Sequence, residues 1–141
     1  MAESLEFTIQ LPVYPERVYR AWLSAGEYRA FTGQAAHIDA RAGGTFTLMD
    51  GQVRGTFETL TPYDHIVQTW HMADFPPNAE SKVELLLEPT CTGTELKVRH
   101  TGIPAGQARK TLEWWESACL RPLSRYFEEI VGEYTADMGD G

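Results

Sequence analysis

The sequence predicts an α+β fold, a curved antiparallel sheet of about seven strands wrapped around one long C-terminal helix. From Gln34 to His100, short runs of alternating apolar and polar residues are separated by turn residues, a pattern typical of strands joined by hairpins. Consecutive hairpins give an antiparallel sheet with one apolar face, which needs a cover. Only the stretch from Ala105 to Val131 is long and periodic enough to be the helix that covers it.

The first elements are a strand and two short helices. Apolar and polar residues alternate from Leu5 to Leu11, which predicts a strand with one solvent-exposed face. Pro15 suits the first turn of a short helix that ends near Trp22. Ser24 is a favourable N-cap for a second short helix, and Gly33 is expected to close it.

The strands that follow are delimited by turns. Turn residues occur at Gly43 and Gly44, at Asp50 and Gly51, from Pro62 to Asp64, from Ala73 to Ala79, and at Thr92 and Gly93. The pair Asp50 and Gly51 is a strong signal for a two-residue hairpin loop. Each strand between these turns alternates, so we expect it to bury one face against the helix.

The long helix carries an apolar stripe and an internal proline. The stripe recurs at spacings of three and four residues and consists of Leu112, Trp115, Cys119, Leu123, Tyr126 and Ile130. Pro122 removes one helical hydrogen bond and clashes one turn back, so we expect a kink near Ala118 rather than two separate helices. Gly132 is expected to end the helix.

Length, charge and hydropathy limit the function. The 141 residues suit one domain over residues 1–132, followed by an acidic, flexible tail over residues 133–141. A net charge of −8 with only 12 basic residues argues against nucleic acid as a partner. No apolar run approaches the roughly 20 residues of a membrane helix, and no signal peptide is visible. We therefore expect a cytoplasmic protein that does not contact a membrane.

The sequence shows no motif for a metal, a cofactor or a catalytic nucleophile. His65 and His71 share the outer face of one strand but lie about 20 Å apart, too far for a common metal ion. Cys91 and Cys119 lack metal-type spacing, and we expect two reduced thiols. A phosphate loop and a serine nucleophile elbow are both missing from the sequence. We expect no cofactor and assign no catalytic residue.

Eight side chains are predicted to line the space between sheet and helix. They are Phe46, Phe57, Gln68, Trp70, Leu85, His100, Trp115 and Cys119. A helix laid across a twisted sheet touches it along only part of its length, which leaves room for a cavity with apolar walls and a few polar groups. For Trp70 and Trp115 the alternative is plain core packing. For His100 it is a structural hydrogen bond at a strand end, and for Gln68 a bulge that exposes it.

Eight segments match a known pattern in their order and spacing. They are Pro15 to Trp22, Arg41 to Phe46, Asp50-Gly51, Gly55 to Glu58, Pro62 to Trp70, Gly93 to Leu96, His100 to Gly102, and Trp114-Trp115. This pattern resembles the helix-grip fold of the START-like, birch-pollen-allergen superfamily (SRPBCC), and in detail the family of activator of heat-shock-ninety ATPase homologues. The resemblance implies a small domain with an interior pocket. The eukaryotic activator has a further N-terminal domain, for which we see no room in this chain.

Three functions stay open at this point. The first is binding of an unknown hydrophobic small molecule in the interior. The second is cyclase-like or hydrolase-like chemistry in the same cavity, with His100 as the natural acid or base, although Glu84 and Glu95 fall on the opposite face. The third is interaction with a heat-shock-ninety-type chaperone in a stress response. We expect a monomer or a weak homodimer, with the edge strand Ala36 to Ala40 as the pairing element.

Overall fold

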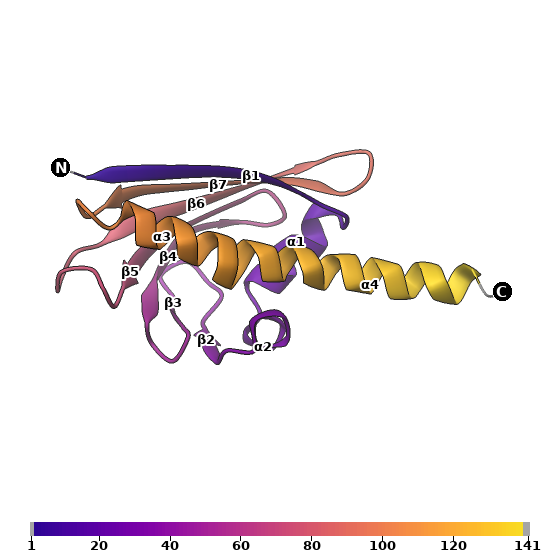
Figure 1. Cartoon of the computed structure of the whole chain (residues 1–141), viewed down its shortest axis with the longest axis horizontal. Coiled ribbons are helices and arrows are strands. Elements are labelled where there is room, and N and C mark those ends of the chain that lie inside the picture. Colours follow the sequence, from indigo (N-terminus) through magenta and orange to yellow (C-terminus); the bar gives the residue numbers. More distant parts are fainter. Residues whose placement is uncertain (1, 140–141) are drawn as a thin grey trace.

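The structure, a computed structural model, describes residues 2–139, with side chains described through Gly132. It confirms the predicted α+β fold and order of elements (Figure 1). The elements are β1 (Glu3–Leu11), α1 (Pro15–Trp22), α2 (Ala25–Thr32), β2 (Ala36–Ile38), β3 (Thr45–Leu48), β4 (Val53–Thr61), β5 (His65–Met72), β6 (Ser81–Pro89), β7 (Thr94–Ile103), α3 (Ala108–Trp114), the π-helical turn η1 (Trp115–Leu120) and α4 (Arg121–Gly139).

Seven strands form one antiparallel sheet in the order β1-β7-β6-β5-β4-β3-β2. The first strand pairs with the last, so β1 and β2 are the two edges. A bulge in β4 between Phe57 and Thr59 lies opposite Gln68, where it bends the strand. Gly55 allows β4 and β5 to approach closely, because a Cβ at this position would lie 2.1 Å from the carbonyl oxygen of Thr69. The sheet curves around the long helix (Figure 1).

The two short helices begin and end as predicted. Pro15 opens α1, and the Ser24 hydroxyl caps α2 by accepting a hydrogen bond from the backbone N–H of Glu27 at 3.2 Å. Gly33 closes α2 with φ of 76°, in the left-handed conformation that glycine adopts readily.

A polar cluster ties both short helices to the long one. Arg17 pairs with Glu27 at 2.6 Å, and the hydroxyl of Tyr126 donates to the same carboxylate at 2.9 Å. The guanidinium also lies over the rings of Tyr126 and Phe127. These contacts fix α1 and α2 against α4.

The predicted hairpin loop at Asp50 and Gly51 is too short. Leu48 pairs with Val53, so the loop contains four residues, 49–52, instead of two. Met49, Asp50 and Gly51 all have positive φ. Met49 begins this loop, and its sulfur accepts a hydrogen bond from the indole N–H of Trp114 at 2.8 Å.

The long helix is one continuous run, as predicted, and its distortion lies where it was expected (Figure 1). Ala118 falls within the π turn, at whose end the N–H of Arg121 donates to the carbonyl of Glu116, five residues back. The wider turn precedes Pro122, which has no N–H to donate.

The ends of this helix differ from the prediction. Gly106 has φ of 83°, so the helix starts at Ala108 instead of Ala105. The carboxylate of Glu3 accepts hydrogen bonds from the N–H groups of Gly106 and Ala108 at 3.1 and 3.2 Å, which satisfies donors at the helix start. The helix passes Gly132 and continues to Gly139, the last described residue. The side chains of the whole predicted tail, residues 133–141, lie outside the described part of the chain.

Two further observations concern the described residues. None of their helices is both long enough and apolar enough to cross a membrane. Cys91 is exposed and Cys119 buried, and both are free thiols.

Candidate functional site

The predicted site residues meet in a core centred on Trp115 of the long helix. Its indole stacks with Trp70 of β5 at 5.3 Å between ring centroids and with Trp22 of α1 at 6.1 Å. The interplanar angles are 22° and 5°. Trp70 and Trp115 are fully buried. The three rings bring sheet, first helix and long helix into direct contact, which is how large aromatic side chains stabilise a core.

His100 is buried and held by two protein partners. The indole of Trp115 can only donate, so Nδ1 of His100 accepts its N–H at 2.9 Å. The hydroxyl of Ser81 donates its one proton to the carbonyl of Trp70 at 2.9 Å, so Nε2 of His100 donates to that hydroxyl at 2.7 Å. The histidine is therefore neutral and protonated on Nε2. Burial lowers its pKa from 6.5 to about 4. His100 also lies within β7, which continues to Ile103, and not at a strand end as the sequence suggested.

Gln68 is buried despite the bulge opposite it. Its Oε1 accepts the indole N–H of Trp22 at 2.8 Å. Beside it lies a void of about 10 Å³, lined also by Tyr28 and Phe46. A void of this size holds about one water molecule. The buried hydroxyl of Tyr28 has no protein partner, and burial raises its pKa.

The remaining predicted residues fill the same core. Phe46 packs against Phe57 at 5.2 Å and against Trp70 at 5.5 Å. Leu85 and Cys119 are fully buried, and burial raises the pKa of the Cys119 thiol. The structure thus brings the eight predicted side chains together, but their own atoms occupy most of the space between them.

A larger pocket opens beside this core, where α3 lies over the ends of β4 and β5. It has a volume of about 170 Å³. Its apolar walls are Val53, Met72, Phe75 and Trp114, and its polar rim includes Asp74, Gln107 and Lys110. Sequence reasoning missed this pocket. The available signal was the adjacent pair Trp114 and Trp115. Because Trp115 occupies the core, Trp114 points in another direction and needs a different surface to pack against.

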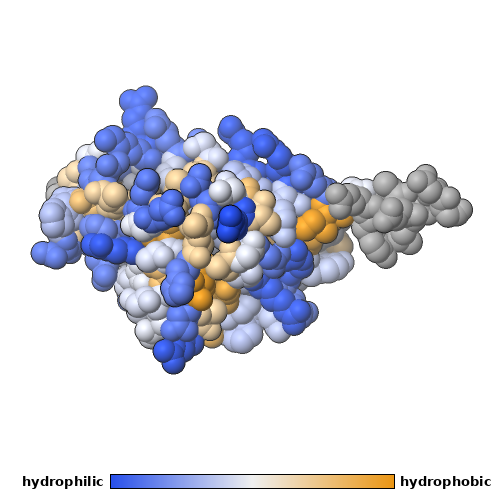
Figure 2. All heavy atoms as spheres, turned by 90° about the horizontal axis from the view of Figure 1, so that it is seen from below, coloured by the Kyte–Doolittle hydropathy of each residue, from blue (hydrophilic) through white to orange (hydrophobic). Residues whose placement is uncertain are grey.

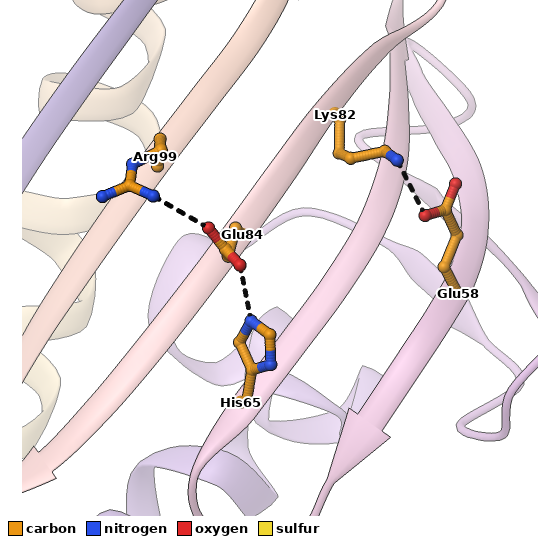
Figure 3. Close-up of polar contacts among 5 residues, drawn as sticks. All are labelled: Glu58, His65, Lys82, Glu84 and Arg99. Carbon is orange, nitrogen blue, oxygen red and sulfur yellow. Dashed lines mark hydrogen bonds and ion pairs between the residues drawn. The ribbon is translucent and has the colours of Figure 1, made fainter.

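The outer face of the sheet carries several ion pairs. Glu84 lies between His65 at 2.7 Å and Arg99 at 3.3 Å, and Lys82 pairs with Glu58 at 3.1 Å (Figure 3). These pairs are partly exposed, so each contributes little to stability. Within the described residues, no group of three or more His, Cys, Asp or Glu is placed to hold a metal ion.

Comparison with known families decides the classification. The sequence profile of the family described as "Activator of Hsp90 ATPase homolog 1-like protein" matches residues 12–128. The chain belongs to this family. Its resemblance to the activator homologues, inferred from the motifs, is therefore confirmed.

Relatives of the family agree with this assignment. The human activator of 90 kDa heat shock protein ATPase homolog 1 is 33% identical over 113 residues, which cover 80% of this chain and 33% of that protein. The Dictyostelium discoideum homologue is 28% identical over 126 residues, covering 89% of this chain and 33% of that protein. The chain thus spans about a third of the length of these curated relatives.

Solved structures share the fold. A crystal structure of an HSP90 activator from Plasmodium falciparum superposes with a TM-score of 0.81 and 27% identity, covering 92% of this chain and 96% of that one. CalU16 from Micromonospora echinospora superposes with a TM-score of 0.76 and 22% identity, covering 99% of this chain and 85% of that one. The second similarity concerns the fold alone.

Proposed function

We propose that this member of the family binds a small, largely apolar molecule in the pocket beneath α3. The observation that carries the proposal is the unfilled space of about 170 Å³ between the start of the long helix and the ends of β4 and β5. Ligand sites are typically concave and apolar, with a few polar groups that orient the ligand. Trp114 provides a flat apolar wall, and Lys110 and Asp74 supply charges at the rim.

The size of the pocket limits the ligand. An engineered apolar cavity of about 150 Å³ holds one benzene molecule. The pocket therefore suits a single ring or a short branched chain, with one polar substituent that reaches the rim. The space around Gln68 holds about one water molecule, so we place the ligand beneath α3 and not under Trp70.

Protein-observed NMR with a library of single-ring fragments tests this proposal. Binding should shift the indole N–H of Trp114 and the backbone amides of Ala73 and Thr111. Ala73→Phe adds a ring at the exposed rim of the pocket and should abolish these shifts. Ala30→Phe adds the same ring to an exposed position on α2 and should leave them unchanged.

Two results would contradict the placement. A fragment that shifts the indole signals of Trp22 and Trp70, with no change at Trp114, would place the ligand in the interior. A library in which no fragment shifts any of these signals would remove the ligand-binding proposal.

A second candidate function is binding to a heat-shock-ninety-type chaperone. It is favoured by the similarity to the human activator and to the Plasmodium falciparum activator. Mixing the protein with the heat-shock-ninety homologue of its host should give a complex on size-exclusion chromatography at low salt, and should raise the ATPase rate of the chaperone. A chaperone that elutes alone, with an unchanged rate, would rule this function out.

We propose no reaction for the interior. His100 is the natural acid or base there, but both of its ring nitrogens are engaged by Trp115 and Ser81. General acid or base catalysis requires a ring nitrogen within reach of the substrate.

A further inference from the structure

The edge strand β1 leaves both backbone groups and apolar side chains available. It is nine residues long and pairs on one side only, with β7. Its inward side chains Leu5, Phe7 and Ile9 are only partly buried, although the corresponding positions of β6 and β7 are fully buried. A groove of about 370 Å³ runs between β1 and the long helix, with Phe7, Ile9 and Leu120 among its walls.

The opposite edge offers less. β2 has three residues and packs against α2. On this side of the molecule, seen from below, apolar side chains show between hydrophilic ones without forming one broad patch (Figure 2). An unprotected edge strand is a template for another strand, and β1 contains no proline and no lysine that would block pairing. Self-association through this sheet would therefore use β1 and not the strand at Ala36 to Ala40.

We propose that two copies of this chain pair along β1, antiparallel, about a two-fold axis at Phe7. Phe7 is the midpoint of Glu3–Leu11, so this register pairs the whole strand with its copy. The inward side chains of the two β1 strands then lie on the same face of the joined sheet. Leu5 of one copy lies opposite Ile9 of the other, and the two Phe7 side chains lie opposite each other. The paired strands form one continuous sheet, and each groove receives apolar side chains of the other copy.

The charges on the strand select this register. Centring the axis on Phe7 places Glu6 of each copy opposite Thr8 of the other. Moving the axis to Glu6 would place the two Glu6 carboxylates directly opposite each other, which is unfavourable. Moving it to Thr8 would leave Glu3 and Ser4 unpaired.

Charges beside the groove also suit a second copy. Glu6 already lies 3.8 Å from Arg99 of its own β7, which offsets its negative charge. At the groove, the helix exposes Glu116 and Arg121. A two-fold axis makes the two helices antiparallel, which brings Glu116 of one copy toward Arg121 of the other. This complementarity favours a copy of the chain over an unrelated strand.

Opposite charges introduced at Thr8 test the proposal. Thr8→Lys places a cation opposite Glu6 of the other copy and should lower the dimer dissociation constant about fivefold. Thr8→Glu places a second anion there and should raise it about fivefold, since each dimer contains two such contacts. Sedimentation equilibrium over a concentration series measures both constants.

The stability of the single chain should change in the other direction. Thr8 pairs with Lys97 within the chain, so the glutamate variant gains a favourable neighbour and the lysine variant an unfavourable one. Urea unfolding of dilute protein, where it is monomeric, measures this effect. If dimerisation changed only because the fold became more or less stable, Thr8→Lys would raise the dissociation constant and Thr8→Glu would lower it. The proposed strand pairing predicts the opposite.

The matched controls are Thr59→Lys and Thr59→Glu, which make the same charge changes at an exposed position of β4. They should leave the dissociation constant unchanged, which excludes an effect of net charge. A chain that stays monomeric at millimolar concentration would overturn the proposal. The proposal would also be refuted if both Thr8 variants shifted the dimer dissociation constant in the same direction. It would fail as well if the Thr59 variants caused the same shifts as the Thr8 variants.

Discussion

The buried histidine makes the fold sensitive to acid through a single group. In the unfolded chain an imidazole takes up its proton below its ordinary pKa of 6.5, whereas His100 in the folded protein does so only near pH 4. Between these values the unfolded chain binds more protons, so a fall in pH favours unfolding. This part of the stability is fully present above about pH 6.5 and is lost as the pH approaches 4.

The magnitude follows from the difference between the two pKa values. Each pKa unit corresponds to about 1.4 kcal/mol, so His100 accounts for a loss of about 3 kcal/mol in the free energy of unfolding between pH 7 and pH 4. The steepest part of the loss, about 1 kcal/mol per pH unit, lies between pH 6 and pH 5. The structural cause is burial, which disfavours the charged imidazolium. A proton on Nδ1 would in addition confront the indole N–H of Trp115, which that nitrogen accepts at 2.9 Å.

Urea unfolding at closely spaced pH values, for the wild type and for His100→Gln, measures this effect. The glutamine can still donate to Ser81 and does not titrate, but it leaves the Trp115 N–H poorly satisfied, at a cost of about 2 kcal/mol at pH 7. The variant should therefore start less stable and lose stability less steeply below pH 6.5. Subtracting the variant's free energy of unfolding from that of the wild type at each pH removes the contribution of the other titrating groups. Parallel curves for the two proteins would refute the buried neutral histidine.

Two further substitutions test the close approach of the strands and the start of the long helix. Gly55→Ala should destabilise the fold by about 3 kcal/mol, because the new methyl group overlaps the carbonyl of Thr69, whereas Gly26→Ala, in an open helical position, should be neutral or stabilising by about 0.5 kcal/mol. Thermal unfolding compares the two alanine variants, and equal effects would contradict the steric explanation. Glu3→Gln should cost about 1 kcal/mol by weakening the cap on the helix start, and Glu6→Gln, on the exposed face of the same strand, should cost little. Urea unfolding checks this pair, and a larger loss for Glu6→Gln would argue against the capping role.

Local signals in the sequence predicted the elements, but not the phase of the long helix. Ser24 and Gly33 marked the ends of α2 correctly because a cap depends on a few neighbouring atoms. The helix stripe was partly wrong, since Leu112, Tyr126 and Ile130 are only partly buried, whereas Thr111, Leu120 and Phe127 are buried. The difference at Thr111 and Leu112 lies before the π turn, and those at Tyr126, Phe127 and Ile130 follow it. The π turn rotates every side chain after it relative to its position in an uninterrupted α-helix. The predicted stripe assumed spacings of three and four residues throughout, so it did not include that rotation.

The sequence predicted which side chains face the interior, but not how much space lies between them. Strand register placed Gln68 and His100 on the inner face, where the structure has them. Whether a cavity lies between them depends on ring contacts between distant parts of the chain, such as Trp22 on Trp115. Alternation within one strand carries no information on those contacts. For the same reason the pocket beside Trp114 was not expected, because it is formed by a loop and a helix that are far apart in the sequence.

The π turn also bears on which changes of length the protein tolerates. A turn closed by bonds to the fifth residue back contains one more residue than the α-helical turn it replaces. Ser117 is exposed within this turn, and its hydroxyl bonds only to the carbonyl of Glu113. Deleting Ser117 would convert the wide turn to an ordinary one and keep Leu123 and Phe127 facing the sheet. A one-residue deletion after the wide turn, for example at the exposed Arg125, would leave that turn in place and rotate Phe127 by about 100° out of its position in the core.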